Sequence, residues 1–348
     1  METMTGNTLL VGSIPLASAE EVFRTCGRLL GDRLSSLPDG EVGDRTFWIT
    51  YVAYHTYHGH PQITTVQRPA PPQWKPTSMD DVWAFKLKDG VTQLRFDKLG
   101  YADDAITSYQ IFRKVRAAGD IPPHVRMQFA FPFPQDATFL FFRDPADHSA
   151  VMAAYEEVLS RELATICKEI PAEDLAIQWD VCTDLLEMTG RYYAWSRPDT
   201  AWERYTGPLS RLPRQVPDKA LLGFHFCYGT FPQKPALDPI DLSLSVKFAN
   251  AAVADSGRRV DYVHMTVPMS HSEDAYFQPL RDLKVGDTKV YLGLVNVDGM
   301  EATKKRLATA RKYLANFGVA AECGFGREKP ENIPGILQMH RAVADELL

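Results

Sequence analysis

The feature that most constrains the fold is an alternation of short apolar segments with helical segments. Each apolar segment is rich in β-branched or aromatic residues and ends near Gly, Pro or Asp, which is typical of a strand followed by a turn. Apolar residues at helical spacing predict helices over 150–170, 241–256 and 301–317. The strand pattern occurs eight times, at 8–15, 33–38, 125–132, 175–182, 221–228, 261–268, 289–296 and 319–323.

Eight strands that alternate with helices predict an α/β protein, a single (β/α)8 TIM barrel. The chain has 348 residues. Barrels of this size form one unit, so we expect one domain over 1–348. Residues 60–119 are too long for a plain connection and include a Pro-rich stretch at 68–76. They are predicted to be an elaborated insertion near the barrel mouth, with a helix of its own.

Composition limits the partners. Lys and Arg total 38 against 44 Asp and Glu, a net charge of −6 with no basic run, which disfavours nucleic acid and anionic membranes. No apolar run approaches the roughly 20 residues of a membrane span, and residues 1–6 lack the basic start of a signal peptide. The five cysteines are widely spaced, which fits reduced thiols. We expect a cytoplasmic protein with a small-molecule substrate and, as an open possibility, an oligomer.

The ends of the predicted strands are unusually polar. In barrels, catalytic groups lie at the C-terminal ends of the strands. Any one of these residues is compatible with a turn, but the set mixes Cys, His and Gln with the usual Asp and Asn, which favours an enzyme. The residues are Ser13, Asp39, Glu41, Gln128, Gln178, Asp180, His225, Cys227, His264, Asn296, Asp298 and Cys323.

The sharpest motif is Gly223-Phe-His-Phe-Cys-Tyr-Gly229. Residues two apart in a strand face the same side, so His225 and Cys227 are expected to point together into the barrel mouth, where both could bind one metal ion. Two ligands do not complete a zinc site, and Cys323 at the end of the last strand is the natural third. The alternative from spacing alone is that both cysteines are buried as small apolar residues and His225 is hydrogen-bonded.

The His225-Phe-Cys227-Tyr-Gly and Cys323-Gly motifs resemble the zinc-binding motifs of the cobalamin-independent methionine synthases, a barrel superfamily that includes uroporphyrinogen decarboxylase. The segments 10–15, 177–180 and 292–298 occur in the matching order, so the resemblance spans most of the chain. It covers the catalytic C-terminal half of the long methionine synthases. The segments 37–45, 129–134 and 275–280 look like those of a divergent branch.

This resemblance implies zinc held by His225, Cys227 and Cys323. The family's fourth ligand is a Glu on the strand after the HxC motif, but 261–268 contains none, so His264 or a water is expected in that place. The implied reaction is the transfer of a methyl or alkyl group to a zinc-bound thiolate. The residues expected to position the acceptor and its amine are Asp39, Glu41, Asp180 and Tyr228.

Two other functions stay open. A lyase or decarboxylase would use Asp39 and Glu41 for protons and Arg45 for a carboxylate, although Pro-Asp-Gly is also a common turn. A third possibility is a non-catalytic, ligand-binding barrel. Gln178 could instead belong to a structural hydrogen-bond network. The residues expected to contact substrate are Ser13, Arg45, Trp48, Gln178, Asn296 and Arg327.

Residues 74–109 combine aromatic and basic side chains beyond what a connector needs. We expect this segment to set substrate specificity as a lid, with packing against the barrel or an oligomer interface as the alternative. No Walker or Rossmann motif occurs, which predicts no nucleotide cofactor. The aromatic and histidine cluster is interpreted as helix packing and not as a metal site; it comprises Tyr51, Tyr54, His55, Tyr57, His58 and His60.

Overall fold

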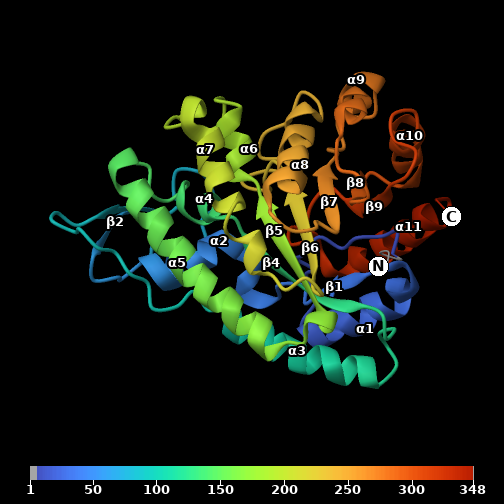
Figure 1. Ribbon diagram of the computed structural model, residues 1–348, viewed down its shortest axis with the longest axis horizontal. Helices are drawn as coiled ribbons and strands as arrows, with labels where there is room; N and C mark the ends of the chain where they lie inside the picture. The colour runs from blue at the N-terminus through green and yellow to red at the C-terminus, as the bar shows by residue number, and fades with distance from the viewer. Residues whose placement is uncertain (1–5, 348) are drawn as a thin grey trace.

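The computed structural model of the protein (Figure 1) describes residues 6–347. The prediction about a signal peptide falls almost wholly outside this range. None of the helices in these residues is long and apolar enough to cross a membrane. The α-helices are α1 Ala19–Leu30, α2 Trp48–Val52, α3 Tyr101–Ala117, α4 Pro134–Thr138, α5 Pro145–Glu169, α6 Thr183–Met188, α7 Pro198–Leu209, α8 Ser243–Asp255, α9 Asp274–Phe277, α10 Met300–Ala310 and α11 Ile333–Asp345.

A parallel sheet forms the centre of the molecule, and helices cover its outer side (Figure 1). Over the described residues it has seven strands in the order β1-β4-β5-β6-β7-β8-β9. Each strand pairs with the next along the chain, apart from the insertion, as expected for repeated strand–helix units. The strands are β1 Ser36–Pro38, β4 Arg126–Pro132, β5 Leu175–Val181, β6 Leu221–Phe226, β7 Tyr262–Thr266, β8 Lys289–Val295 and β9 Gly318–Ala321.

The parallel α/β sheet predicted from the alternation is confirmed, but the closed barrel of eight strands is wrong. The expected first strand, 8–15, makes only isolated parallel bridges, from Thr8 to Leu34 and from Thr8 to Val319. The carbonyl groups of Leu10 and Val11 accept hydrogen bonds from the side chains of Gln128 and Gln178 and not from a neighbouring strand. The segment therefore lies between the two edge strands of the curled sheet without becoming a strand itself.

The other predicted elements occur with shifted ends. The helix expected over 150–170 begins earlier, at Pro145, because Asp144 caps it by accepting a hydrogen bond from the Ala146 N–H at 2.9 Å. The helix expected over 301–317 ends at Ala310. The strand expected over 33–38 shortens to β1 because a 3-10 turn, Gly31–Arg33, precedes it. The remaining short segments are a π-helical turn, Ala53–Tyr57, and 3-10 turns at Gly43–Phe47, Ala172–Asp174, Pro213–Gln215, Gln278–Asp282 and Pro330–Asn332.

The predicted insertion has two parts. Its first part is an antiparallel hairpin of β2 Ile63–Gln67 and β3 Ala84–Leu87, which projects from the side of the molecule (Figure 1). Its second part is α3, which packs against α1 and α5 as one of the helices around the sheet. The aromatic residues that suggested a lid are all buried: Trp83, Phe85, Phe96, Tyr101 and Tyr109.

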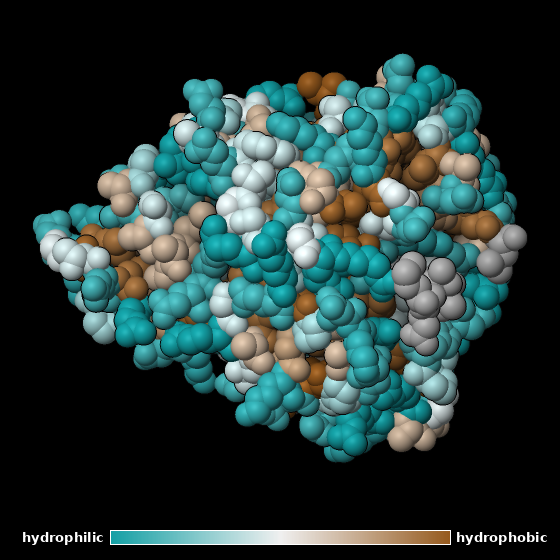
Figure 2. Space-filling view, viewed as in Figure 1, coloured by the Kyte–Doolittle hydropathy of each residue, from teal (hydrophilic) through white to brown (hydrophobic). Residues whose placement is uncertain are grey.

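A polar layer fills the inside of the curled sheet. Gln178 of β5 accepts hydrogen bonds from Gln128 of β4 at 3.2 Å and from the Tyr262 hydroxyl of β7 at 3.1 Å. Gly223 of β6 leaves room for the aromatic ring of Tyr262, since a Cβ atom at position 223 would lie 2.0 Å from that ring. The outer surface is mostly hydrophilic in Figure 2, with apolar residues at the projecting hairpin, where Val66 is 62% exposed.

Candidate metal centre

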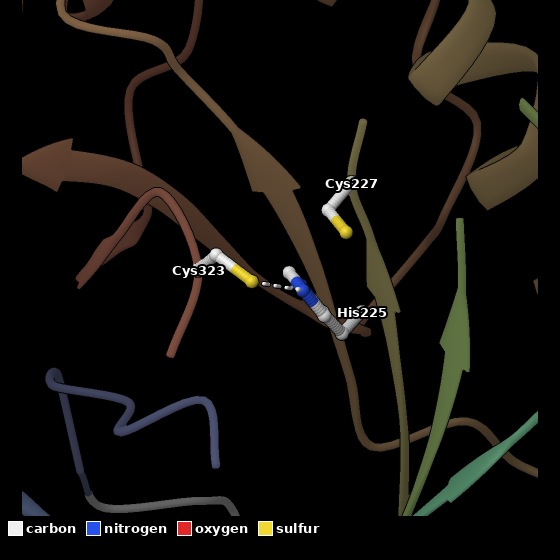
Figure 3. Close-up of side chains that lie close together, drawn as sticks. All are labelled: His225, Cys227 and Cys323. Atoms are coloured by element: carbon white, nitrogen blue, oxygen red, sulfur yellow. Dashed lines mark hydrogen bonds between the residues drawn. The ribbon is translucent and has the colours of Figure 1, made fainter. Parts of the chain in front are cut away.

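Three parallel strands bring the central site residues to one level. Asp180 of β5 is paired with His225 of β6, and His225 is paired with His264 of β7. Cys227 follows β6 and faces the same side as His225, because side chains two residues apart in an extended chain point the same way. Cys323 follows β9 and approaches from the loop opposite them (Figure 3).

His225, Cys227 and Cys323 form a group that could hold a metal ion. One ligand atom from each lies within 4.8 Å of the others. The Cys323 Sγ lies 3.5 Å from His225 Nε2, the contact drawn in Figure 3. One imidazole nitrogen and two sulfurs are ligands that zinc binds, and three protein ligands leave a fourth position open. Among the described residues this is the single His, Cys, Asp or Glu cluster with such geometry.

His264 lies behind His225 and not among these ligand atoms. Its Nδ1 is 2.6 Å from the Nδ1 of His225, and its Nε2 is buried without a hydrogen-bond partner. Burial lowers the pKa of His264 to about 3, so its ring is neutral at physiological pH. The prediction that His264 is a fourth ligand is therefore not supported, since strand pairing places its ring next to the ring of His225 on the side away from Cys323.

A cysteine that the sequence reasoning missed lies beside this group. The Cys182 thiol, just after β5, contacts the Cys227 thiol, and Cys227 also contacts Cys323. The contact with Cys182 and burial raise the pKa of Cys227, and the contact with Cys227 and burial raise that of Cys323. A bound cation would reverse this effect and favour the thiolates. The position of Cys182 at a predicted strand end was the signal that could have identified it.

The candidate ligands lie in the wall of a cavity of about 180 Å³. Most of its other walls are apolar or aromatic, which is typical of small-molecule sites. Segments far apart in the sequence contribute, including Met79 and Val82 from the insertion. The aromatic and aliphatic lining residues are Val11, Phe47, Trp48, Ile49, Met79, Val82, Leu140, Leu186, Tyr192, Tyr193, Phe231 and Ala236.

Two carboxyl groups predicted to be catalytic also line this cavity. Glu41 accepts a hydrogen bond from the Ser13 hydroxyl, and burial raises the pKa of Glu41 to about 7. Its φ is +48°, a left-handed conformation that is uncommon outside glycine and is often found at functional sites. Asp180 accepts a hydrogen bond from Gln178 Nε2 at 2.8 Å, and its pKa is raised by burial and by the nearby Glu41.

Asp39 and Arg45 are bound to each other beside the cavity. The Arg45 guanidinium donates to Asp39 Oδ2 at 2.6 Å, and the Ser108 hydroxyl donates to the same oxygen at 2.6 Å. Asp39 Oδ1 accepts from the backbone N–H of Glu41 at 2.9 Å. Both residues line a smaller neighbouring pocket that Glu41 shares. In this arrangement Asp39 positions the loop that carries Glu41.

Three other predicted residues lie outside the main cavity. Tyr228 is buried on the opposite side of the chain from Cys227, because adjacent residues in an extended segment alternate. The Asn296 side chain donates to the Val267 carbonyl at 3.1 Å. Gln178 is fully buried in the interior layer, where it holds Asp180, so the structural network considered for it is present.

Arg327 and Trp48 line the cavity as predicted for substrate contacts. The Arg327 guanidinium lies 4.6 Å from the centre of the Phe47 ring and 5.8 Å from that of Phe231. No carboxylate of the described residues pairs with it in an ion pair, so its charge is available at the cavity edge. The sequence reasoning missed Asp136, which also lines the cavity, because it follows β4 within the short helix α4.

The aromatic and histidine cluster of α2 and the turn that follows it packs as predicted. The Tyr54 ring stacks on Trp74 at 5.2 Å between ring centres and on His58 at 6.0 Å. The His58 Nδ1 is 3.1 Å from the Thr65 hydroxyl. No metal-binding group includes these histidines among the described residues.

The fold is that of an α/β protein built on a curled parallel sheet, with a group of His and Cys side chains at the strand ends that could hold a metal ion. Solved structures of this fold include a B12-independent methionine synthase from Shewanella sp. W3-18-1 in complex with selenomethionine; the TM-score is 0.57 at 15% identity, over 99% of this chain and 98% of that one. A putative vitamin-B12 independent methionine synthase from Listeria monocytogenes gives 0.58 at 12% identity, over 99% of both chains. No family model and no curated protein matches the sequence. These similarities establish the fold.

Proposed function

We propose that this protein is a zinc-dependent enzyme that transfers a methyl or alkyl group to a thiol. The observation that carries the proposal is the group of His225, Cys227 and Cys323, with ligand atoms within 4.8 Å at the wall of an apolar cavity. The similarity in fold to methionine synthases supports it. Zinc at this site would hold the substrate thiol as a thiolate, the form of sulfur that attacks carbon.

The residues fit this ion. The donor set of one nitrogen and two sulfurs is one that zinc accepts. His225 presents Nε2 to Cys323, while its Nδ1 is engaged by His264, which is the usual arrangement of a metal-binding histidine held by a second residue. When His225 Nδ1 carries the hydrogen and donates it to His264, the Nε2 lone pair is free for a metal.

The cavity lining supports a small, amino-acid-like thiol as substrate. The Arg327 guanidinium fits a carboxylate. Glu41 and Asp180 line the same cavity, and a carboxyl oxygen of either residue could accept a hydrogen bond from an amine group of the substrate. The apolar walls exclude water from the reacting sulfur. A small-molecule substrate, no nucleotide cofactor and a reducing compartment such as the cytoplasm are part of this proposal.

Metal analysis with matched cysteine variants tests the site. We expect about one zinc per chain in the wild type and little in Cys227→Ser or Cys323→Ser, because a protein ligand is lost. Cys167→Ser is the control, since Cys167 lies in α5 and has no role in the cluster. X-ray absorption should show two sulfurs near 2.3 Å from zinc, and a third after a thiol substrate is added. A wild type that neither contains nor takes up zinc would contradict the proposal.

Activity is tested with a panel of small thiols, with and without an amino-acid head group, together with methyl donors. Thioether formation is followed by mass spectrometry and should be lost in Cys323→Ser and retained in Cys167→Ser. Binding of a thiol with no transfer from any donor would instead favour the ligand-binding function.

A lyase or decarboxylase is the second candidate, because the pKa of about 7 makes Glu41 a suitable acid or base. It predicts turnover of carboxylated substrates that is lost in Glu41→Gln and kept in Cys227→Ser. The two sets of variants therefore separate the two functions. Asp39 is not expected to share this role, since its oxygens are occupied by Arg45, Ser108 and the Glu41 N–H.

A further inference from the structure

The walls of the cavity and of the smaller pocket beside it are rich in acidic groups. Glu41 and Trp48 line both spaces, so they stand between the two. Among the described residues, the lining contains five carboxyl groups, two guanidinium groups and no lysine. This excess of negative charge favours a ligand that carries a positive charge. The carboxyl groups are those of Asp39, Glu41, Asp104, Asp136 and Asp180, and the guanidinium groups are those of Arg45 and Arg327.

Glu41 is the carboxyl group between the two spaces, and it lacks a cation. The Arg45 guanidinium is held by two other carboxyl groups, at 2.6 Å from Asp39 Oδ2 and 3.7 Å from Asp104 Oδ2. Within residues 6–347, no cation lies at ion-pair distance from Glu41, and its side chain accepts a hydrogen bond from the Ser13 hydroxyl. A carboxylate enclosed among apolar groups is unfavourable without a cation, so a bound cation would stabilise it.

Aromatic side chains line the pocket that Glu41 shares. Trp48 lines both spaces, and no other ring or cation stacks on its ring in the part of the chain that the structure describes. Tyr51, Tyr101 and Phe129 complete the aromatic lining of the smaller pocket. Aromatic faces attract cations, and they are the usual means by which proteins bind quaternary ammonium groups. Trp48 beside Glu41 therefore offers an aromatic face and a negative charge to the same ligand.

The two spaces together fit a small methylated cation and a thiol. The smaller pocket has a volume of about 20 Å³, which holds one water-sized group such as a methyl group. The main cavity, at about 180 Å³, has room for the rest of such a cation next to the thiol. Asp180, paired with His225 on the adjacent strand, stays available for the amine of the thiol substrate.

The charges of the proposed reaction also favour a cationic donor. A thiolate and an onium cation carry opposite charges, and methyl transfer between them gives two neutral products. Water stabilises the separate charges more than the transition state in which they cancel, so a cavity that excludes water favours this step. An onium donor also leaves as a neutral molecule, so its leaving atom needs no proton.

We propose that the methyl donor of this protein is a small methylated onium cation that binds against Trp48 with its charge beside Glu41. The inference rests on the proposed transferase function. The thiolate sulfur attacks a methyl carbon, and the new sulfur–carbon bond forms as the bond from that carbon to the onium atom breaks. The electron pair stays on the onium atom, which leaves as a neutral thioether or amine. The thiol proton passes to water, and no oxidant or reductant is needed.

Choline and its uncharged carbon analogue, 3,3-dimethylbutan-1-ol, test the cation site because they share a shape and differ in charge. We expect the purified protein to bind choline at least about tenfold more tightly in calorimetric titrations. Glu41→Gln should remove most of this preference. Trp48→Leu should weaken choline binding by about 3–30-fold, the range of a cation–π contact, and change binding of the alcohol by about twofold or less. Trp202→Leu, in α7 outside the cavity, is the control.

Transfer is measured with trimethylsulfonium and with methyl benzenesulfonate, a neutral donor, each relative to its uncatalysed reaction with the same thiol. We expect the protein to accelerate transfer from trimethylsulfonium more strongly. Glu41→Gln should reduce this acceleration and leave that of the neutral donor unchanged, because only the cation gains from the carboxylate. Tetramethylammonium, tested in parallel, distinguishes a nitrogen donor from a sulfur donor.

The outcomes separate the inference from the function on which it rests. Equal affinity for choline and its analogue, or a preference for choline that persists in both variants, overturns the onium site. Acceleration of the neutral donor alone overturns the inference and leaves the transferase function standing. Transfer from no donor overturns the transferase function, and a preference for choline then supports the cation site in a ligand-binding protein. Equal unfolding midpoints show that a variant has lost binding and not its fold.

Discussion

The two ring nitrogens of His225 have separate contacts. Nε2 faces Cys323 at 3.5 Å, and Nδ1 contacts His264 Nδ1 at 2.6 Å. A histidine whose second nitrogen is held in this way keeps one tautomer and one ring orientation, which favours metal binding. In the proposed zinc site, His264 would therefore orient His225.

Replacing His264 should weaken the metal site without removing a ligand. His264→Ala is expected to lower zinc affinity by about 10–100-fold, because the ring of His225 loses its support. Competition with a chromophoric chelator measures the affinity. The exposed His124→Ala is the control. An unchanged affinity in His264→Ala would show that His225 is oriented by other contacts.

Glu41 predicts a specific dependence of stability on pH. Its pKa is about 7 in the folded protein against an ordinary 4.5, so between these values the folded state keeps a proton that the unfolded state loses. The contribution of Glu41 to the free energy of unfolding is therefore largest below pH 4.5, and it is lost as the pH rises to about 7. Relative to the wild type, Glu41→Gln should therefore gain up to about 3 kcal/mol in free energy of unfolding between pH 4.5 and pH 8. Urea unfolding at both values measures this gain, and a difference that does not change with pH would contradict the raised pKa.

At the scale of elements, the hairpin of β2 and β3 combines an anchored strand with a loop that reaches the cavity. The Phe85 N–H donates to the Phe141 carbonyl at 2.9 Å, and the Leu87 N–H donates to Asp147 at 2.9 Å, so β3 is fixed to the body of the protein. Met79 and Val82, from the loop before β3, line the cavity. The burial of the aromatic residues of β3 indicates that this strand packs against the protein. The loop before β3 lies where it can contact a ligand in the cavity.

Hydrogen exchange should separate these two parts. Amides over 74–82 are expected to exchange more slowly when a substrate thiol is bound, because the loop then closes against the ligand. Amides of β3 should not change, since they are already bonded to the body. Equal protection of both parts in the free protein would place the whole segment in the rigid wall, and protection that grows with protein concentration would indicate an interface.

At the scale of the whole molecule, the interior polar layer connects segments from both halves of the chain. Gln128 donates to the carbonyls of Leu10 and Val11 in the N-terminal segment and to Gln178. Tyr262 completes this layer, in the space that Gly223 leaves. Gln178 of this layer also holds the Asp180 side chain. The position of Asp180 in the cavity wall therefore depends on this hydrogen-bond network.

Gly223→Ala should therefore destabilise the protein by about 1–3 kcal/mol or more, because the new methyl group overlaps the Tyr262 ring. Gly335→Ala is a matched control in α11, where an added Cβ meets no atom within 4 Å, and it should be neutral or stabilising by up to about 1 kcal/mol. Thermal and urea unfolding measure both variants. A Gly223→Ala protein as stable as the wild type would mean that the interior layer tolerates a displaced tyrosine.

The sequence by itself determined seven of the eight predicted strands and the three residues of the candidate metal group. Hydrophobic periodicity is a local property, so it identified the parallel α/β architecture, and the two-residue spacing of His225 and Cys227 placed both on one side of a strand. The place of Cys323 at the end of the last predicted strand, together with the family resemblance, suggested the third ligand, 98 residues away from His225. These predictions depended on short sequence patterns, which do not require knowledge of the tertiary contacts.

Only the tertiary structure decided which polar groups meet. Strand pairing placed His264 behind His225. The glutamine side chains bind backbone carbonyls of the N-terminal segment that would pair with a neighbouring strand in a closed barrel. Tyr228 and Asn296 turned away from the cavity, whereas Cys182 and Asp136 joined it. The orientation of a side chain and its distance from partners far along the chain are set by strand register and packing, which no local pattern contains.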